Sequence, residues 1–311
     1  MKVLVTGGAG FIGSHVVDAL IRQDHDVIVV DNFATGRRDN LNHSARLFEV
    51  DIRDEKKLAE IFERERPEAV NHHAAQIDVS KSVKDPSFDA QVNIIGSLSL
   101  LENCARYGVR KVIYASSGGA ICGNIENVPA DEKHPVNPIS PYGVSKYTVE
   151  HYLHTYNIIH GIDYVVLRYP NVYGPRQSPS GEAGVVAVFA MQMLRGERIT
   201  IFGSGDKTRD YTHVFDITNA NLLSIRSDST GIYNIGTGAK ITDQEVFDTL
   251  AKVLGYSDDP IYTDVRPGEI YHSYLDSAKA CRDLGWKPRF GFKEGIIQAA
   301  DYYKSLVGTF E

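Results

Sequence analysis

Tyr142 and Lys146 are the two side chains whose types and spacing best support chemistry in this sequence. A helix is predicted over residues 141–160, and a four-residue spacing on it places both side chains on one face, one turn apart. A tyrosine hydroxyl ordinarily titrates near pH ~10, and a neighbouring ammonium in a partly desolvated cleft favours the phenolate. Such a pair can act as a general base toward a hydroxyl group. The spacing also occurs by chance on exposed helices, so the surrounding elements decide what it means.

Three glycines near the start of the chain, Gly7, Gly10 and Gly13, lie between a predicted strand and a predicted helix. Gly7 permits a tight turn, Gly10 lets the backbone approach a pyrophosphate, and Gly13 allows close contact between helix and strand. The N-terminus of the helix then offers free N–H groups and a partial positive charge to phosphate groups. A glycine-rich turn alone is weak evidence, but in this context it predicts a dinucleotide site.

Asp31 strengthens that prediction because it ends the second predicted strand. It lies close to the ~20 residues past the glycines at which a carboxylate binds both ribose hydroxyls. A carboxylate repels a 2′-phosphate, so NAD is favoured over NADP as the cofactor. Arg37 and Arg38 lie nearby and keep NADP open as an alternative.

Short apolar strands alternate with helices through the first half of the chain, which predicts an α/β fold with a Rossmann-type doubly wound parallel sheet. The strands are predicted over residues 3–6, 27–30, 47–50, 69–72, 111–116 and 164–168, and the helices over 11–22, 55–64, 87–107 and 141–160. Beyond Tyr169 the segments become shorter and richer in Gly and Pro, which predicts a smaller C-terminal mixed α/β lobe. We expect residues 1–168 with 210–235 to form the dinucleotide domain, and 169–209 with 236–311 the substrate lobe.

The composition excludes several classes of protein. A net charge of -7 argues against nucleic-acid and acidic-membrane binding, and no stretch approaches the ~20 apolar residues of a membrane span. The three cysteines form neither a disulfide framework nor a zinc pattern, and only two residues precede the first strand, which leaves no signal peptide. The adjacent His72 and His73 point to opposite faces of a strand. We therefore expect a cytoplasmic protein without a metal site.

Taken together, ordered motifs over nearly the whole chain resemble the extended short-chain dehydrogenase/reductase family, and within it the UDP-hexose 4-epimerases. The motifs are Thr6–Gly13, Asp31-Asn32, Asp51, His73–Gln76, Asn93–Gly96, Ser116-Ser117, Tyr142–Lys146, Arg168–Arg176, Arg209–Tyr211, Asn234–Gly236 and Arg266–Gly268. The resemblance implies tightly bound NAD, a transient 4-keto sugar and interconversion of UDP-glucose with UDP-galactose. It also implies a homodimer formed through the helices predicted over 87–107 and 141–160.

The resemblance further implies the residues of each site. Asp51 and Ile52 would flank the adenine, Asn171 would bind the sugar diphosphate, and Arg209 and Arg266 would pair with its phosphates. The full set implied for NAD is Gly7, Gly10, Phe11, Ile12, Gly13, Asp31, Asn32, Thr35, Gly36, Asp51, Ile52, Ala74, Ala75, Asn93, Tyr142, Lys146, Tyr169 and Pro170. The set implied for the substrate is Gln76, Ser117, Tyr142, Asn171, Gly184, Val185, Arg209, Arg266 and Ser273.

The sequence departs from the family pattern beside the catalytic tyrosine. The position that usually holds a hydroxyl is occupied by Gly118, so Ser117 is assigned as the third catalytic residue, brought inward by a turn at Gly118-Gly119. The alternative is that Ser117 faces a packed interior and a water replaces it. Ala120 stands where related dehydratases and decarboxylases carry a carboxylate, which favours simple oxidation and return of hydride.

A second departure concerns the size of the sugar. Ser273 stands where family members restricted to small hexoses have a tyrosine, so UDP-GlcNAc and UDP-GalNAc become plausible substrates. Alternatively, Tyr271 or Tyr274 fills the gap. Two other functions stay open: a nucleotide-sugar 4-ketoreductase or related oxidoreductase that consumes external cofactor, and a binding protein that has kept the fold and lost the chemistry.

Overall fold

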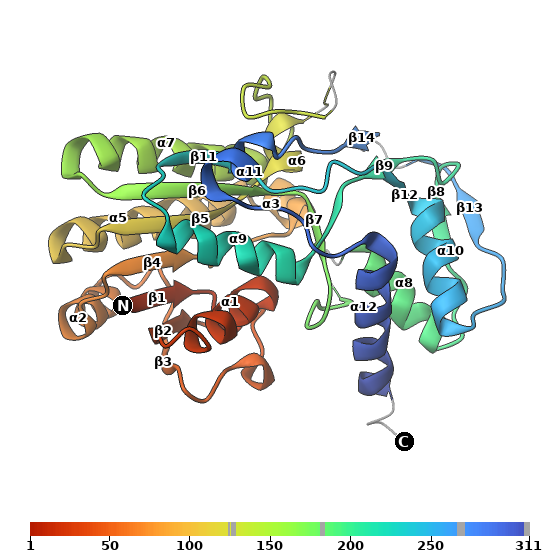
Figure 1. The fold of residues 1–311 in the computed structure, drawn as a ribbon, viewed down its shortest axis with the longest axis horizontal. Helices are drawn as coiled ribbons and strands as arrows, with labels where there is room; N and C mark the ends of the chain where they lie inside the picture. Colours follow the sequence, from red (N-terminus) through yellow and green to blue (C-terminus); the bar gives the residue numbers. More distant parts are fainter. Residues whose placement is uncertain (124, 126–128, 181–183, 266–270, 308–311) are drawn as a thin grey trace.

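A parallel sheet of seven strands lies at the centre of the computed structural model, which describes residues 1–123, 125, 129–180, 184–265 and 271–307. The strand order is β11-β6-β5-β4-β1-β2-β3, and helices cover both faces of the sheet (Figure 1). Its strands are β1 (Lys2–Thr6), β2 (Asp26–Asp31), β3 (Arg46–Glu49), β4 (Ala69–His72), β5 (Lys111–Ser117), β6 (Asp163–Tyr169) and β11 (Gly231–Asn234). The strand order reverses between β1 and β4, and the carboxyl ends of strands at such a point form a ligand-binding crevice.

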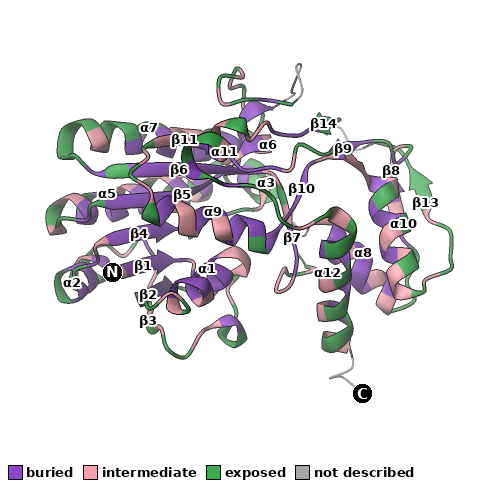
Figure 2. Cartoon of the chain, viewed as in Figure 1, coloured by how far each residue is buried: buried purple, intermediate pink, exposed green. Residues whose placement is uncertain are grey.

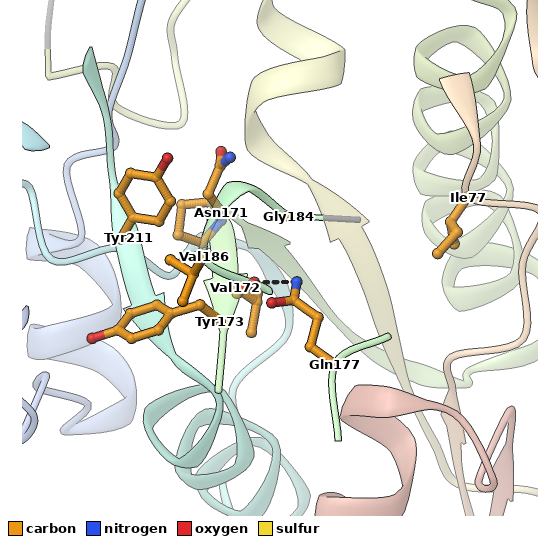
Figure 3. Close-up of a pocket in the computed structure, with 9 residues that line it drawn as sticks. Ile77, Asn171, Val172, Tyr173, Gln177, Gly184, Val186 and Tyr211 are labelled. Carbon is orange, nitrogen blue, oxygen red and sulfur yellow. Dashed lines mark hydrogen bonds between the residues drawn. The ribbon is translucent and has the colours of Figure 1, made fainter. Parts of the chain in front are cut away.

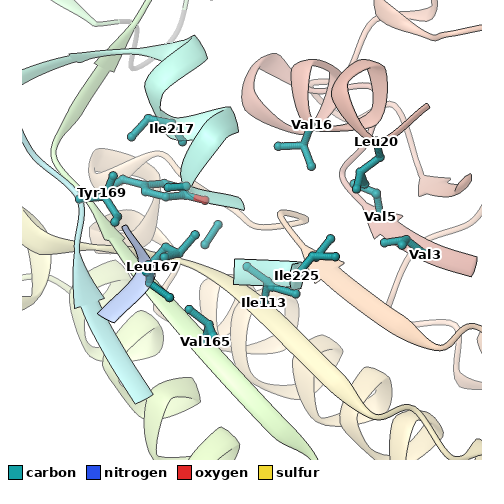
Figure 4. Close-up of a cluster of buried hydrophobic side chains, with 14 of the residues drawn as sticks. Val3, Val5, Val16, Leu20, Ile113, Val165, Leu167, Tyr169, Ile217 and Ile225 are labelled. Atoms are coloured by element: carbon teal, nitrogen blue, oxygen red, sulfur yellow. The ribbon is translucent and has the colours of Figure 1, made fainter. Parts of the chain in front are cut away.

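Successive side chains of each strand point to opposite faces of the sheet, and each face has its own hydrophobic core. Val3 and Val5 pack with α1 (Phe11–Ile21) and α9 (Val214–Arg226), as Figure 4 shows. Leu4 packs on the opposite face, and Figure 2 shows that the central strands between the two layers are mostly buried. The helices of that opposite face are α2 (Glu55–Glu65), α5 (Gly96–Tyr107) and α7 (Pro141–His160).

A smaller lobe forms a third core at one end of the sheet. Its helices are α8 (Val185–Leu194), α10 (Asp243–Leu254) and α12 (Phe292–Val307), which pack together away from the sheet (Figure 1). Its short strands are β7 (Asn171–Tyr173), β8 (Thr200–Phe202), β9 (Thr208–Arg209), β10 (Tyr211–His213), β12 (Ile241–Thr242), β13 (Ile261–Thr263) and β14 (His272–Ser273). They pair as β10-β7, β12-β9-β14 and β13-β8.

The predicted fold class is confirmed, and the helix predicted over 87–107 is present in three consecutive parts. These are α4 (Pro86–Ala90), a π-helical turn labelled η2 (Gln91–Ile95), and α5. Short elements in the connections were not predicted: η1 (Arg38–Asn40), α3 (Val79–Lys84), α6 (Gly118–Cys122) and α11 (Ala278–Leu284). The division into two domains stays a prediction, and Leu284 and Trp286 from the C-terminal part pack in the core between the sheet and α1.

A buried ion pair ties α7 to the sheet. Arg168 on β6 donates two hydrogen bonds to Glu150 on α7, from Nε at 3.0 Å and from an Nη atom at 2.6 Å. Both side chains are almost completely buried, at 3% and 1% exposed. Ser116 on β5 donates a third bond to the same carboxylate, at 2.7 Å. Three elements therefore meet at one buried charge, and removing either ion would leave the other desolvated without its partner.

We expect Arg168→Ala to lower the free energy of unfolding by about 3–5 kcal/mol, because Glu150 would stay buried without a counter-charge. Arg110→Ala is the matched control, since Arg110 pairs with Glu68 at 2.9 Å on the surface and such pairs contribute less than about 1 kcal/mol. Urea unfolding of the cofactor-free protein measures both losses. Equal losses in the two variants would contradict the prediction.

Candidate functional site

The glycine loop between β1 and α1 is a place where the backbone folds closely on itself. A Cβ at Gly13 would lie 2.2 Å from the carbonyl oxygen of Gly7. A Cβ at Gly7, whose φ is +67°, would lie 2.7 Å from the backbone nitrogen of Ala74. Gly10 forms the N-cap of α1, and no described side chain caps this helix. The N–H groups of its first turn, including those of Phe11 and Ile12, therefore remain available to a phosphate.

Asp31 lies at the carboxyl end of β2 with its carboxylate held at the edge of this loop. One oxygen accepts the N–H of Ala9 at 2.9 Å, and the other accepts the N–H of Phe33 at 2.8 Å. Burial raises the pKa of Asp31, and these two hydrogen bonds oppose that effect. Gly36 packs against the carboxylate so closely that a Cβ there would lie 2.9 Å from Oδ1. Each oxygen keeps further acceptor capacity for a ribose hydroxyl.

The two arginines that kept NADP open are occupied elsewhere. Arg37 pairs with Asp39 at 3.5 Å, and Arg38 pairs with Glu49. The Arg38 guanidinium also lies 4.3 Å from the centre of the Phe33 ring. Both contacts draw the arginines toward neighbouring side chains, while Asn32 and Thr35 beside them are exposed.

The residues predicted to flank the adenine lie where β3 ends. Arg53 donates two bonds to the Asp51 carboxylate, at 2.9 and 2.8 Å, and Asn32 donates a third at 2.8 Å. These bonds hold the pKa of Asp51 at about 2, with Arg53 as the main cause. Ile52 is buried against Gly96. A Cβ at Gly96 would lie 2.8 Å from the Cδ1 atom of Ile52.

The loop after β4 is held by the side chain of Asn93 in the π-helical turn. Asn93 accepts the N–H of Gln76 at 2.8 Å and donates to the carbonyl of Gln76 at 2.9 Å. The N–H of Ala74 donates to the hydroxyl of Thr6 at 3.2 Å, and Ala75 follows it, partly buried. The Gln76 side chain, predicted to contact substrate, is buried and bonds instead to Asp78 and Asp89. We therefore assign Gln76 a role in holding the loop.

Close packing sets the position of the catalytic pair at the start of α7. Ser140 caps the helix by accepting the N–H of Gly143 at 3.2 Å. A Cβ at Gly143 would lie 2.3 Å from the carbonyl oxygen of Ala120, so α6 reaches α7 only because this residue is glycine. The backbone N–H of Tyr142 donates to the hydroxyl of Ser82 on α3, at 3.2 Å. Two elements that were not predicted from the sequence thus fix where Tyr142 lies.

Lys146 is 4% exposed, and its ammonium donates to the carbonyl of Ala115 at 2.9 Å. The Nζ atom lies 5.9 Å from the centre of the Tyr142 ring, in agreement with the predicted shared face. Burial lowers the pKa of Lys146 to about 8, while Asp89 and Glu150 act in the opposite direction. The ammonium is therefore close to its titration range at neutral pH, which suits a group that supports proton transfer.

Ser117 ends β5 and caps α6, accepting the N–H of Ala120 at 3.3 Å. The chain changes from β5 to α6 at these glycines, although neither Gly118 nor Gly119 has a positive φ. A Cβ at Gly118 would lie 2.5 Å from Cδ1 of Leu275. A side chain at position 118 would therefore require Leu275 to move. Ser117 is the neighbouring hydroxyl, and it is partly buried.

A cavity of about 270 Å³ opens between the sheet and the smaller lobe (Figure 3). Pro170, Asn171 and Gly184, which were predicted as site residues, lie in its wall, and Val185 next to Gly184 begins α8. The backbone N–H of Asn171 donates to the carbonyl of Asp210 at 3.0 Å. The sequence did not identify the other residues that line it: Ile77, Val172, Tyr173, Gln177, Val186 and Tyr211.

Arg209 and Ser273 are opposite each other in the β9-β14 pair. Arg209 donates to the carbonyls of Thr208 and Tyr271, at 3.0 and 3.2 Å. The Ser273 hydroxyl is directed toward α6, 3.3 Å from where a Cβ at Gly119 would be. Arg266 lies outside the described residues.

The tyrosines beside Ser273 do not share its position. Tyr271 is 43% exposed and is hydrogen-bonded to Asp206. Tyr274 is 3% exposed, with the ammonium of Lys240 5.1 Å from the centre of its ring. As the next residue of an extended segment, Tyr274 points away from the face that Ser273 presents to α6.

Buried polar side chains around the catalytic helix were not found from the sequence. Tyr169, which was predicted to bind NAD, is buried, and its hydroxyl accepts a bond at 2.8 Å from Asn221, a residue that the sequence did not indicate. Asp89 lies four residues before Asn93, and this helical spacing was the available signal for a shared contact. Among the described residues, no group of His, Cys, Asp or Glu is arranged to hold a metal ion, and no helix is long and apolar enough to cross a membrane.

Comparison with known proteins extends these observations. The model of the NAD dependent epimerase/dehydratase family matches residues 3–236. A UDP-glucose 4-epimerase from Mycolicibacterium smegmatis is 40% identical over 98% of this chain and 99% of its own length. The structure of a Thermotoga maritima UDP-glucose 4-epimerase with UDP-glucose has a TM-score of 0.97, 48% identity, and coverage of 99% of this chain and 100% of that one.

A Thermus thermophilus UDP-glucose 4-epimerase, solved in complex with NAD, has a TM-score of 0.93 and 45% identity, covering 98% of this chain and 99% of that one. Similarity of this degree extends through both the sheet and the smaller lobe. With the glycine loop, Asp31 and the Tyr142–Lys146 pair in place, the chain belongs to the NAD dependent epimerase/dehydratase family.

Proposed function

We propose that this protein is a UDP-hexose 4-epimerase that interconverts UDP-glucose and UDP-galactose. The observation that carries the proposal is the buried Lys146 ammonium beside Tyr142, on a helix whose start packs against the loops at the carboxyl edge of the sheet. The relatives with UDP-glucose and with NAD, which match this chain almost end to end, support the same activity.

The glycine loop fits a dinucleotide cofactor, because Gly7 and Gly13 have no room for a Cβ and the first turn of α1 is uncapped among the described residues. Asp31 would hold the adenosine ribose, and the N–H groups of Phe11 and Ile12 would face the pyrophosphate. When bound, NAD supplies reversible oxidation at C4 of the sugar by accepting and returning a hydride.

The residues of the chain manage the proton and hold the sugar. Tyr142 removes the proton of the C4 hydroxyl and later returns it, while the Lys146 ammonium stabilises the phenolate. Ser117 holds the C4 oxygen by a hydrogen bond. The diphosphate is bound by Asn171, Arg209 and Arg266. The 4-keto sugar can therefore rotate and present its other face without leaving the site.

Epimerisation is favoured over the other chemistry of the family by Ala120. This residue lies on α6, with its carbonyl against Gly143, and offers no acid for elimination or decarboxylation. A 4-ketoreductase is the second candidate, since it would use the same tyrosine and lysine but consume external cofactor.

Substrates with an N-acetyl group at C2 are supported by the small Ser273 side chain, since Tyr271 is exposed and Tyr274 lies on the other face of the segment, so neither ring takes its position. UDP-GlcNAc and UDP-GalNAc are therefore included in the proposed substrate range. We also propose that residues 1–168 with 210–235 bind NAD and that 169–209 with 236–311 bind the nucleotide sugar. A homodimer and a cytoplasmic location complete the proposal.

The proposed activity is tested by following the C4 configuration of UDP-glucose by NMR in the presence of purified protein. We expect UDP-galactose to accumulate to an equilibrium mixture with no net formation of NADH, and UDP-GlcNAc to react as well. The Tyr142→Phe variant, which lacks the hydroxyl, is the negative control. NADH released in proportion to product would instead establish a net oxidoreductase.

NAD is expected to bind more tightly than NADP, and Asp31→Asn should reduce the ratio of the two affinities by about tenfold or more. The reason is that the Asp31 carboxylate repels a 2′-phosphate, and one unit of charge at close range is worth more than ~1 kcal/mol. Equilibrium titration of cofactor-free protein measures both constants. Arg37→Ala is the control and should leave the ratio unchanged, since Arg37 is turned toward Asp39. Tighter binding of NADP than of NAD by the wild type would contradict the assignment.

Ser117→Ala should lower kcat by about 100-fold to 1,000-fold, the range in which removal of one hydrogen-bond donor at a reacting oxygen lies. Ser116→Ala is a useful comparison because Ser116 bonds to Glu150 rather than facing the site. Initial rates of epimerisation at saturating substrate provide the measurement. If kcat of Ser117→Ala stays near that of the wild type, another group or a water supplies the bond.

A further inference from the structure

Asp89 is a completely buried carboxylate in the short helix α4, and three neutral side chains donate to it. Gln76 Nε2 and Asn93 Nδ2 donate to one oxygen, at 2.9 and 3.0 Å. Ser145 Oγ donates to the other oxygen at 2.6 Å. The exposed fraction of Asp89 is 0%, and within the described part of the chain it forms no ion pair. Its charge is therefore solvated by the protein but is not neutralised by contact with a cation.

The three donors come from the parts of the molecule that form the site. Gln76 belongs to the loop after β4, and Asn93 belongs to the π-helical turn that holds this loop. Ser145 lies on α7, immediately before Lys146 and three residues after Tyr142. Asp89 thus connects the catalytic helix to the loop after β4 and the π-helical turn through a single carboxylate. The predicted NAD residues Ala74, Ala75 and Asn93 lie in these two segments, which we call the cofactor channel.

The Lys146 ammonium is buried beside this network, and a buried ammonium needs negative charge nearby to keep its proton. Two carboxylates raise the pKa of Lys146, and Asp89 contributes more than Glu150. Glu150 is paired with the buried Arg168 guanidinium at 2.6 Å, so a cation in direct contact opposes its field. Asp89 has only neutral partners, so its charge is the one that acts on Lys146 without compensation.

Other ionisable groups that face Lys146 contribute little charge. At the end of β4, burial lowers the pKa values of His72 and of the next residue, His73, to about 3, so both are neutral at working pH. On β5, burial raises the pKa of Tyr114 well above its ordinary value, and this ring too is neutral. The remaining group is Tyr142 on α7, the partner of Lys146 in proton transfer.

We propose that Asp89 is a positioning residue that fixes α7 to the cofactor channel and supplies the negative charge that keeps the buried Lys146 protonated. This inference rests on the proposed epimerase function, in which charged Lys146 stabilises the Tyr142 phenolate. No residue next to Asp89 in the network needs to touch the sugar for this role. Asp89 acts on the reaction only through Ser145 and Lys146.

Two variants separate the charge of Asp89 from its hydrogen bond. Asp89→Asn removes the charge but preserves the network, because the amide oxygen accepts from Gln76 and Asn93 while the Ser145 hydroxyl reverses to accept from the amide nitrogen. Ser145→Ala removes the hydrogen bond and leaves the charge. The two substitutions are therefore matched controls for each other.

Loss of the charge makes the potential at α7 more positive, which favours the phenolate and disfavours the ammonium. Both limbs of the bell-shaped dependence of kcat on pH should then move to lower pH in Asp89→Asn, by about 1 unit or more. In Ser145→Ala kcat should fall several-fold with both limbs unmoved. A loss of kcat in Asp89→Asn without movement of either limb would overturn the proposal.

A measurement independent of activity is the NMR titration of Lys146, using lysine labelled with ¹³C at Cε and assigned with Lys146→Arg. In the wild type the ammonium should hold its proton through neutral pH, and in Asp89→Asn it should lose it about 1 unit earlier. If Asp89→Asn does not fold, the wild type still decides, because a Lys146 that titrates below pH ~7 would overturn the proposal. Absence of epimerisation by the wild type would count against the proposed function alone, since this titration requires no turnover.

Discussion

Two buried carboxylates, Glu150 on α7 and Asp89 on α4, hold the helix that carries the reactive side chains of this protein. Glu150 binds the helix to β5 and β6 through Ser116 and Arg168, and Asp89 binds it to α4 through Ser145. A buried charge tolerates little displacement, because its hydrogen-bonding partners must remain within reach. The helix is therefore fixed from two directions.

The cofactor side of the site depends on close approach of backbone to backbone. At Gly13 and Gly143 a side chain would occupy the place of a carbonyl oxygen, at 2.2 and 2.3 Å. The first contact closes the loop before α1, and the second brings α6 against the start of α7. The first contact follows β1, next to the point where the strand order reverses, and the second follows β5. Absence of a Cβ, rather than an unusual φ, is what Gly13 and Gly143 contribute.

The smaller lobe influences the catalytic edge through β14 and the residues after it. Leu275 occupies the space that a side chain at position 118 would need, and Ser273 approaches Gly119. The hydroxyl proposed for catalysis and the space proposed for a C2 substituent are therefore linked by one short segment. A change in this segment would affect both the position of Ser117 and the size of sugar accepted.

The sequence by itself determined the class of fold, because buried parallel strands leave continuous apolar runs and helices leave a 3.6-residue period. It also identified Gly7, Gly10, Gly13 and Asp31, whose roles depend on local backbone geometry and on distance along the chain. The shared face of Tyr142 and Lys146 followed from helical spacing for the same reason.

Only the tertiary structure decided which distant groups meet. Asp89 contacts Ser145 across 56 residues of sequence, and Leu275 reaches Gly118 from the other lobe. The Gln76 amide bonds to Asp78 and Asp89, two partners that the sequence did not indicate. The chain changes direction at Gly118, where α6 begins, but nothing in the sequence indicated that Leu275 packs against this position. Periodicity reports which face of an element is buried, but not which element covers that face, and the partners of a buried polar group depend on the covering element.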